Sequence, residues 1–228
     1  MKIAVFGATG RVGSIVTNLC VKEGYKVNAL VRDKEKAENL PPEVHIIHGQ
    51  PTEARDVEKT IKDGDIVFSA LNTDKTYTLS TATSLIIQTM LSYGVNRIIT
   101  IGTAGILNSQ YVKGKYRFQS KESKRRSTFA AEEHAKAYQL LNKSTLDWVI
   151  LCPTFLPDGA SEGTVRYERE SSSGQWQKDY CNRHSSICIQ RDQGKGISPY
   201  TRRIKLLNLK QLYKRRLFRL VRKCLFSL

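Results

Sequence analysis

Short apolar runs alternate with amphipathic segments along the first 150 residues of this chain. The apolar runs have the length and composition of buried strands and lie at 2–6, 26–31, 44–47, 65–71, 97–101 and 147–151. Between them apolar positions recur every three or four residues, which predicts helices at 14–23, 54–62, 80–93 and 129–142. Strands that alternate with helices indicate a doubly wound α/β fold with a parallel sheet, for which we predict the Rossmann strand order 3-2-1-4-5-6.

A glycine-rich turn joins the first predicted strand to the first predicted helix. Gly7, Gly10 and Gly13 have the spacing GxxGxxG. The first glycine allows a sharp turn, the second leaves room for a pyrophosphate, and the third lets the helix pack closely on the sheet. Because the amides at the start of the helix would face the anion, this context predicts a dinucleotide site. A purely structural glycine turn is the alternative.

The end of the second predicted strand bears on which nicotinamide coenzyme binds. NAD sites usually place a carboxylate here, which accepts a hydrogen bond from the ribose 2′-hydroxyl. In this chain Arg32 is the first polar residue after the strand, and Arg11 adds a positive charge in the glycine turn. Guanidinium groups suit a 2′-phosphate, so we predict a preference for NADP(H). Asp33 is the competing signal that keeps NAD(H) open, and both arginines could instead be solvated surface charges.

Together these motifs resemble those of the atypical short-chain dehydrogenases/reductases. Over residues 1–170 the chain is most similar to flavin-reductase/biliverdin-IXβ-reductase-like and NmrA-like NAD(P)-binding proteins. The motifs that carry the resemblance are the glycine turn and the segments 29–33, 65–71, 97–105, 132–137 and 146–154. The resemblance implies an NAD(P)H-dependent reductase of Rossmann fold. Hydride would pass from the nicotinamide to a small acceptor, for which a flavin, a quinone and a carbonyl compound all remain open.

The resemblance also implies that the coenzyme lies across the strand ends. It would contact Gly7, Thr9, Gly10, Arg11, Val12, Gly13, Arg32, Ala70, Leu71, Thr103 and Pro153. The glycine turn would hold the pyrophosphate, 70–71 would line the adenosine, and Thr103 and 152–154 would lie near the nicotinamide. The chain departs from the family at Gly49-Gln50, where a Gly-Asp pair with an acidic adenine contact is frequent.

Three residues are candidates for catalysis: Thr103, Tyr111 and His134. The Tyr-x-x-x-Lys pair of the wider superfamily is matched by Tyr111 and Lys115, in a basic polar loop that is either a solvated surface or a substrate lid. His134 could donate a proton near neutral pH, with a packing or surface histidine as the alternative. The proteins that the chain resembles generally lack the Tyr–Lys pair, and there the protein mainly orients the reactants.

Charge divides the chain into two parts. The net charge of +16 is concentrated in residues 171–228, which contribute +12, whereas residues 1–170 are close to neutral at +4. We therefore expect an NAD(P)-binding domain over 1–170 and a poorly ordered basic tail over 171–228. A one-base shift across 175–200 would permit codons for a strand entry and an amphipathic helix, so we hypothesise a slipped reading frame there.

If residues 171–228 are instead in their native reading frame, their positive charge favours an anionic partner. Residues 206–228 could form a basic amphipathic helix that lies on an anionic membrane surface. Contacts to nucleic-acid phosphates are a weaker alternative, and we do not expect them.

Further features limit the location and the class of the protein. No apolar run reaches the roughly 18–20 residues that span a bilayer, the N-terminus lacks the pattern of a signal peptide, and the five cysteines show no metal-ligand spacing. We expect a cytoplasmic enzyme without a metal, which acts on a small molecule as a monomer or small homo-oligomer. An NmrA-like sensor that binds the dinucleotide without turnover is the alternative function.

Overall fold

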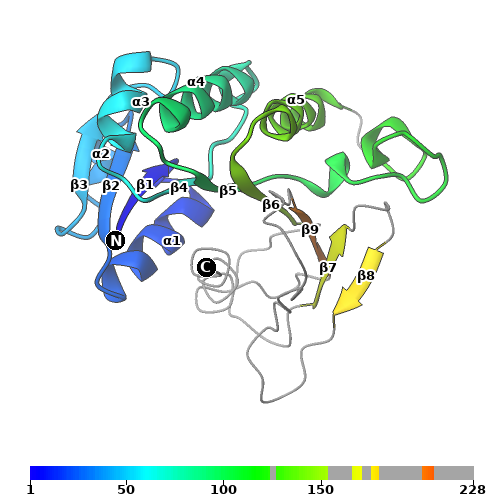
Figure 1. The fold of residues 1–228 in the computed structure, drawn as a ribbon, viewed down its shortest axis with the longest axis horizontal. Coiled ribbons are helices and arrows are strands. Elements are labelled where there is room, and N and C mark those ends of the chain that lie inside the picture. The colour runs from blue at the N-terminus through cyan, green and yellow to red at the C-terminus, as the bar shows by residue number, and fades with distance from the viewer. Residues whose placement is uncertain (124–126, 154–165, 171–175, 180–201, 208–228) are drawn as a thin grey trace.

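The computed structural model describes residues 1–123, 127–153, 166–170, 176–179 and 202–207, with side chains up to Pro153. These residues contain one sheet with the strand order β3-β2-β1-β4-β5-β6-β9-β7-β8 (Figure 1). Its first six strands are parallel, which confirms the predicted Rossmann order. They are β1 (Lys2–Phe6), β2 (Lys26–Val31), β3 (His45–His48), β4 (Ile66–Ser69), β5 (Arg97–Ile101) and β6 (Asp147–Pro153).

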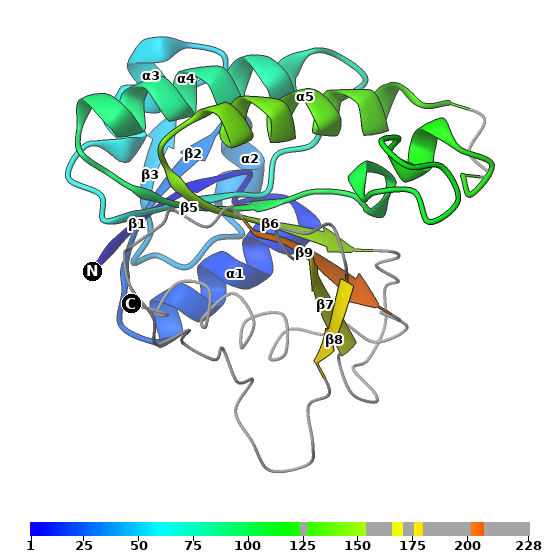
Figure 2. The same cartoon turned by 45° about the vertical axis from the view of Figure 1, so that its right-hand side comes forward.

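Helices cover both faces of this sheet (Figure 2). Helix α1 (Arg11–Lys22) lies on one face, and α3 (Ala54–Ile61), α4 (Thr78–Ser92) and α5 (Phe129–Lys143) lie on the other. Successive strand residues point to opposite faces, so Val5 joins the apolar cluster under α1 while Phe6 joins the cluster under α3 to α5. Burial on both faces explains why the strands are apolar throughout rather than alternating.

The parallel arrangement brings several chain segments to one edge of the sheet. Chain segments leave β1 at Gly7, β2 at Arg32, β4 at Ala70 and β5 at Gly102. All four positions follow the C-terminal ends of parallel strands, the edge at which ligands bind in open α/β sheets.

The outer part of the sheet departs from the sequence prediction. Strands β7 (Arg166–Glu170) and β8 (Trp176–Asp179) lie where the apolar pattern predicts no strand. Strand β9 (Arg202–Leu207) pairs in parallel with β6 and antiparallel with β7. Strands β8 and β9 lie within residues 171–228, the segment expected to be a basic tail. Leu206 and Leu207, where the membrane-binding helix was expected to begin, lie in strand β9. The rest of that expected helix, and the other residues of the expected tail, lie outside the described residues.

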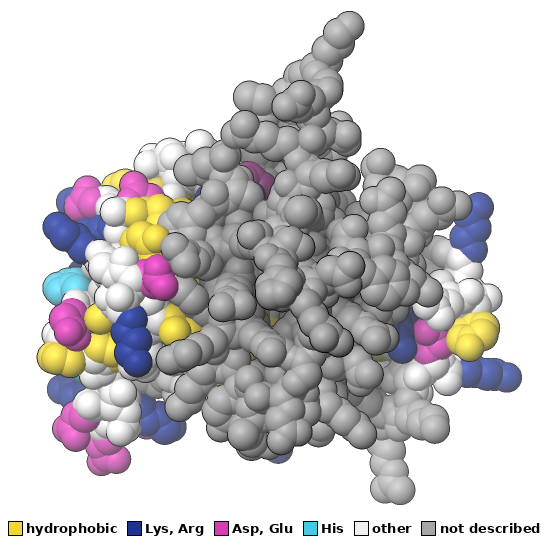
Figure 3. Space-filling model, turned by 90° about the horizontal axis from the view of Figure 1, so that it is seen from below, with side chains coloured by type: hydrophobic (Ala, Val, Ile, Leu, Met, Phe, Trp, Pro, Cys, Tyr) yellow, Lys and Arg dark blue, Asp and Glu magenta, His cyan; other side chains and the backbone are white. Residues whose placement is uncertain are grey.

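Charged side chains of both signs are mixed on the described part of the surface in Figure 3, where dark blue and magenta groups alternate. This mixture agrees with the small net charge of residues 1–170. Within the described residues, no helix is long and apolar enough to cross a membrane.

Candidate functional site

The glycine turn between β1 and α1 is closed so tightly that side chains do not fit. Gly7 has a φ of +79°, and its carbonyl accepts a hydrogen bond from the amide of Gly10 at 3.1 Å. A Cβ atom on Gly13 would lie 1.9 Å from the Gly7 oxygen, and one on Gly7 would lie 2.7 Å from the Ala70 oxygen. The structure therefore requires glycine at 7 and 13 for close packing, as the dinucleotide motif predicts.

The start of α1 is suited to hold an anion. Gly10 is the N-cap residue and provides no side-chain hydrogen bond, and the first turn contains no acidic residue. The backbone hydrogen bonds of the helix begin with the amide of Ser14, which donates to the Gly10 oxygen at 2.8 Å. The amides of residues 11–13 precede that bond and lie at the positive end of the helix. Thr9 and Val12 are half-buried beside this turn and Arg11 is exposed, so these residues fit a pyrophosphate.

Arg32 and Asp33 at the end of β2 have different environments. Asp33 is the N-cap of the short helix α2 (Lys34–Ala37), and its Oδ1 accepts from the amides of Glu35 and Lys36 at 3.1 and 3.4 Å. The Lys36 side chain adds a 3.1 Å ion pair, and these contacts, the hydrogen bond from Lys36 foremost, lower the pKa of Asp33 below its ordinary value. Arg32 is exposed and directed toward the loop after β4, where it pairs with Asp74.

The loop after β4 lies against the glycine turn. The amide of Ala70 donates to the Phe6 oxygen at 2.9 Å, and both Ala70 and Leu71 are half-buried. The Ala70 carbonyl and the Leu71 amide lie next to Gly7. Two residues predicted to line the adenosine are thus next to the turn predicted to hold the pyrophosphate.

The turn after β3 contains a carboxylate that sequence reasoning missed. Asp56 of α3 accepts a hydrogen bond from the amide of Gln50 at 2.9 Å. A Cβ atom on Gly49 would lie 2.2 Å from the same carboxylate oxygen. The Gly-Asp pair of the family is absent from the sequence at 49–50, but an acidic group from the next helix occupies this turn.

Thr103 and Pro153 lie on the part of this edge formed by β5 and β6. The Thr103 hydroxyl accepts from the amide of Gly105 at 3.4 Å and caps the 3-10 helix η1 (Ala104–Ile106). Pro153 ends β6, and the amide of Gly102 donates to the Leu151 oxygen between the two strands at 2.8 Å. Thr154 lies outside the described residues.

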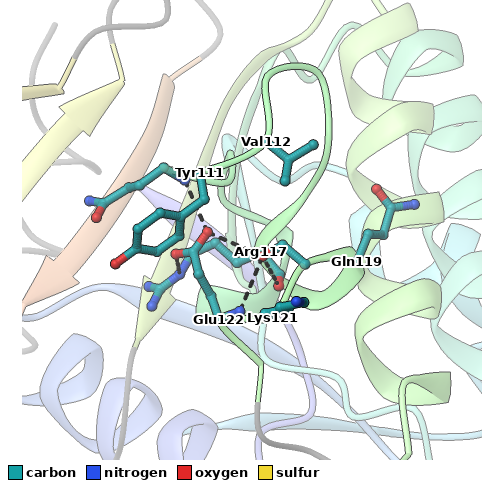
Figure 4. Close-up of a pocket in the computed structure, with 8 residues that line it drawn as sticks. Tyr111, Val112, Arg117, Gln119, Lys121 and Glu122 are labelled. Carbon is teal, nitrogen blue, oxygen red and sulfur yellow. Dashed lines mark hydrogen bonds and ion pairs between the residues drawn. The ribbon is translucent and has the colours of Figure 1, made fainter.

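Tyr111 lies in the loop between η1 and α5. Its side chain is 82% exposed, and no hydrogen bond joins it to Lys115 in the described part of the chain. The loop borders an open hollow of about 780 Å³, where Figure 4 shows Glu122 and Arg117 close to Tyr111. The structure does not arrange Tyr111 and Lys115 as a catalytic pair.

Glu122 organises this loop from inside. Its carboxylate accepts hydrogen bonds from the Ser109 hydroxyl at 2.7 Å and the Gln110 amide at 3.0 Å, and it forms a 3.0 Å ion pair with Arg117. Burial alone would raise the pKa of Glu122, but these hydrogen bonds, one from Ser120 and the charge of Arg117 together lower it. These contacts hold the loop together along the border of the hollow.

The N-terminal half of α5 contains His134 and a buried carboxylate. His134 is half-buried, whereas its neighbour Glu133 has no exposed surface. Glu133 accepts from the amide and hydroxyl of Ser80 on α4 at 3.3 and 2.8 Å, and from the Lys136 ammonium at 2.9 Å. The Lys136 ammonium also lies 4.8 Å from the ring centroid of Tyr77. A carboxylate that holds two helices together was missed because its partner lies on another helix.

A Rossmann sheet with a glycine turn at the C-terminal end of β1 and an uncapped helix start defines a dinucleotide-binding protein. The model of the NAD(P)H-binding family matches residues 7–185. The chain belongs to this family.

Several solved structures share the fold. An anaerobillin reductase from Escherichia coli O157:H7 is 25% identical, with a TM-score of 0.62, over 73% of this chain and 79% of that one. A putative epimerase from Bacteroides thetaiotaomicron is 27% identical with a TM-score of 0.62, over 74% and 78%. A short-chain dehydrogenase/reductase from Veillonella parvula in complex with NADP is 18% identical with a TM-score of 0.59, over 76% and 77%. At that identity the last protein supports the fold alone.

Proposed function

We propose that this protein is an NADP(H)-preferring oxidoreductase that transfers hydride from the nicotinamide to a small acceptor such as a flavin, a quinone or a carbonyl compound. The proposed coenzyme preference rests on one observation, the different surroundings of Asp33 and Arg32 at the end of β2. Asp33, the acidic residue that would favour NAD(H), is held by two amides of α2 and by Lys36. Arg32 is exposed at the same strand end, where its guanidinium can reach a 2′-phosphate.

The glycine turn supports the same coenzyme. The amides at the start of α1 and the closely packed Gly7 and Gly13 fit a pyrophosphate. Thr103 and Pro153 would then lie on the nicotinamide side, because β5 and β6 follow β4 in the sheet. When bound, the coenzyme supplies the hydride, while these residues bind it, orient it and exclude water.

The acceptor would bind beside the nicotinamide, next to the loop 107–123. This loop packs against α5: the ring of Tyr116 in the loop lies 6.2 Å from the ring of Tyr138 on the helix. The similarity to the anaerobillin reductase from Escherichia coli supports an acceptor-reducing activity. We propose that the protein acts mainly by orienting the coenzyme and the acceptor. Thr103 and His134 are the residues to test as proton donors.

Coenzyme titration tests the binding part of the proposal. Arg32→Asp should weaken NADPH binding by about 1.5–3 kcal/mol, the scale of a charge-assisted contact. It should not weaken NADH binding, because a carboxylate at this strand end can accept a hydrogen bond from the ribose 2′-hydroxyl. Lys26→Asp makes the same charge change at the opposite end of β2 and serves as the matched control. Equal affinity of the unaltered protein for both coenzymes would contradict the proposed preference.

Turnover tests the catalytic part. We expect NADPH oxidation to accelerate when flavins, quinones or carbonyl compounds are added singly to the protein. Tight coenzyme binding without acceptor-dependent oxidation across the panel would favour the alternative, a dinucleotide sensor. Thr103→Ala and His134→Asn, measured with the best acceptor, then separate a loss of kcat from a loss of coenzyme affinity.

A further inference from the structure

An ion pair joins the proposed 2′-phosphate ligand to the loop after β4. The Nη1 atom of Arg32 lies 2.7 Å from Oδ2 of Asp74, and the two side chains are 51% and 35% exposed. The guanidinium that we propose for the coenzyme therefore already has an anionic partner within the protein. A 2′-phosphate would have to share this guanidinium with Asp74 or displace Asp74 from it.

The position of Asp74 is fixed by the loop. Asp74 and Lys75 have φ values of +50° and +58°, a left-handed conformation that is uncommon outside glycine. The loop is held by the carbonyl of the buried Thr73, which accepts from the amide and the hydroxyl of Thr76 at 2.8 and 3.1 Å. Its first residue, Ala70, is bonded to β1. The turn from Thr73 to Thr76 thus encloses Asp74, and Ala70 ties the start of the loop to β1.

The two coenzymes differ in how they respond to such a carboxylate. The 2′-phosphate of NADPH has close to two negative charges near neutral pH, so Asp74 both repels it and competes for Arg32. The 2′-hydroxyl of NADH is neutral, and a carboxylate can accept its hydrogen bond. We infer that Asp74 is a specificity-determining residue, which limits the preference for NADPH because it competes with the 2′-phosphate for Arg32. This inference rests on the proposed coenzyme function.

The other charges near Arg32 have separate roles. Asp33 is held at the N-terminus of α2, and Lys36 pairs with Asp33. Lys75 is exposed beside Asp74 and adds positive charge to the loop, as Arg11 does to the glycine turn. Asp74 is therefore the carboxylate whose removal frees Arg32 without loss of a helix cap.

The test compares Asp74→Asn with Asp63→Asn. Asp63 is also an exposed aspartate with a positive φ, of 59°, but it lies in the turn before β4 at the opposite edge of the sheet. Asparagine tolerates this backbone conformation, so both variants should fold, which a thermal melt without coenzyme verifies. Dissociation constants are measured for NADPH, NADH and adenosine 2′,5′-bisphosphate at low and high salt.

We expect Asp74→Asn to tighten the binding of NADPH and of the bisphosphate by roughly two- to fivefold, the scale of an exposed ion pair, and to leave NADH unchanged or weaker. The gain should shrink at high salt, because exposed charges are screened, and Asp63→Asn should change neither coenzyme. In an Arg32→Ala background the gain should largely disappear, as a double-mutant cycle requires for competing partners.

Different results would contradict the proposed function and the inference about Asp74. If the unaltered protein binds neither coenzyme, the proposed function falls, and this inference falls with it. If it binds NADPH and Asp74→Asn changes both coenzymes equally, or no more than Asp63→Asn does, the inference about Asp74 alone is wrong. An unchanged gain in the Arg32→Ala background would likewise refute competition for Arg32.

Discussion

Replacement of Glu133 by glutamine tests how α4 and α5 are held together. Glu133 has no exposed surface, and its two carboxylate oxygens have different partners. Oε2 accepts both hydrogen bonds from Ser80, and Oε1 accepts from Lys136. A glutamine could direct its carbonyl oxygen to Ser80, but its amide group would then face the Lys136 ammonium as a second donor.

The expected cost follows from these contacts. A hydrogen bond to a charged group contributes about 1.5–3 kcal/mol, against about 0.5–1.5 kcal/mol for a neutral one. Glu133→Gln makes the Ser80 bonds neutral and removes the Lys136 bond, while the half-exposed lysine returns to water. We expect a loss of about 2–3 kcal/mol in the free energy of unfolding, or a fall of roughly 5–10 °C in Tm for a chain of this size.

The pH dependence provides a second measurement. Burial alone would raise the pKa of Glu133, but the hydrogen bonds from Lys136 and Ser80 outweigh it and lower the pKa below the ordinary 4.5. A lowered pKa stabilises the fold fully above the ordinary value, and this stabilisation is lost as pH falls through the native pKa. The difference in Tm between the unaltered protein and Glu133→Gln should therefore be largest above pH 5 and shrink below pH 4.5.

Glu132→Gln is the matched control, because Glu132 is the exposed neighbour and its hydrogen bond comes from Thr128 within the same helical turn. Thermal melts by circular dichroism over the pH range give all the quantities. The reasoning is refuted if Glu133→Gln and Glu132→Gln have the same Tm, or if the loss for Glu133→Gln does not depend on pH.

Four other outcomes are expected. Gly13→Ala should raise the Kd for NADPH more than tenfold and lower stability by about 1–3 kcal/mol, because its Cβ would lie 1.9 Å from the Gly7 oxygen; titration and melts would measure both, and normal binding would contradict the tight turn. Burial, and secondarily the charge of Glu23, raise the pKa of the Cys20 thiol to about 12. Cys20 should therefore stay unlabelled by iodoacetamide at pH 8 until guanidinium is added, as peptide mass mapping would show. Tyr111→Phe should change kcat less than twofold, since the ring is 82% exposed and is not hydrogen-bonded to Lys115 in the described part of the chain; a large loss at normal coenzyme binding would show a catalytic role. In the nucleotide sequence of the gene, one inserted or deleted base near codons 170–175 should restore a family-like ending, whereas the same tail in independently sequenced relatives would overturn the frame-slip hypothesis.

The inner sheet could be predicted because its signals are local. Each of the first six strands is a short apolar run, and the glycine turn is contiguous in sequence, so the order of the strands and the position of Gly7 and Gly13 followed directly. Element ends were less exact: α4 was predicted to begin at Ser80 and begins at Thr78. Asp33 could have been identified as a helix cap, since aspartate is a preferred N-cap residue.

Asp74, Asp56 and Glu133 could not be found in the same way. Their roles depend on partners in other elements, at Arg32, Gln50 and Ser80. A polar residue in a loop or on a helix has the same sequence signature whether it meets water or a distant partner. The strand period of β8 was missed because four residues are too few for alternation to stand out.

The position of β9 in the sheet has a consequence for biosynthesis. Among the described strands, β7 and β8 pair with the six inner strands only by way of β9, although β9 is the last of the described strands to leave the ribosome. During synthesis the inner sheet can form first, and β7 and β8 can pair with each other while β6 remains an open edge. That edge exposes unpaired backbone groups, which readily pair with another chain. A chain that stops between residues 179 and 202 would keep this open edge permanently, so nascent or truncated copies should need a chaperone more than the finished protein does.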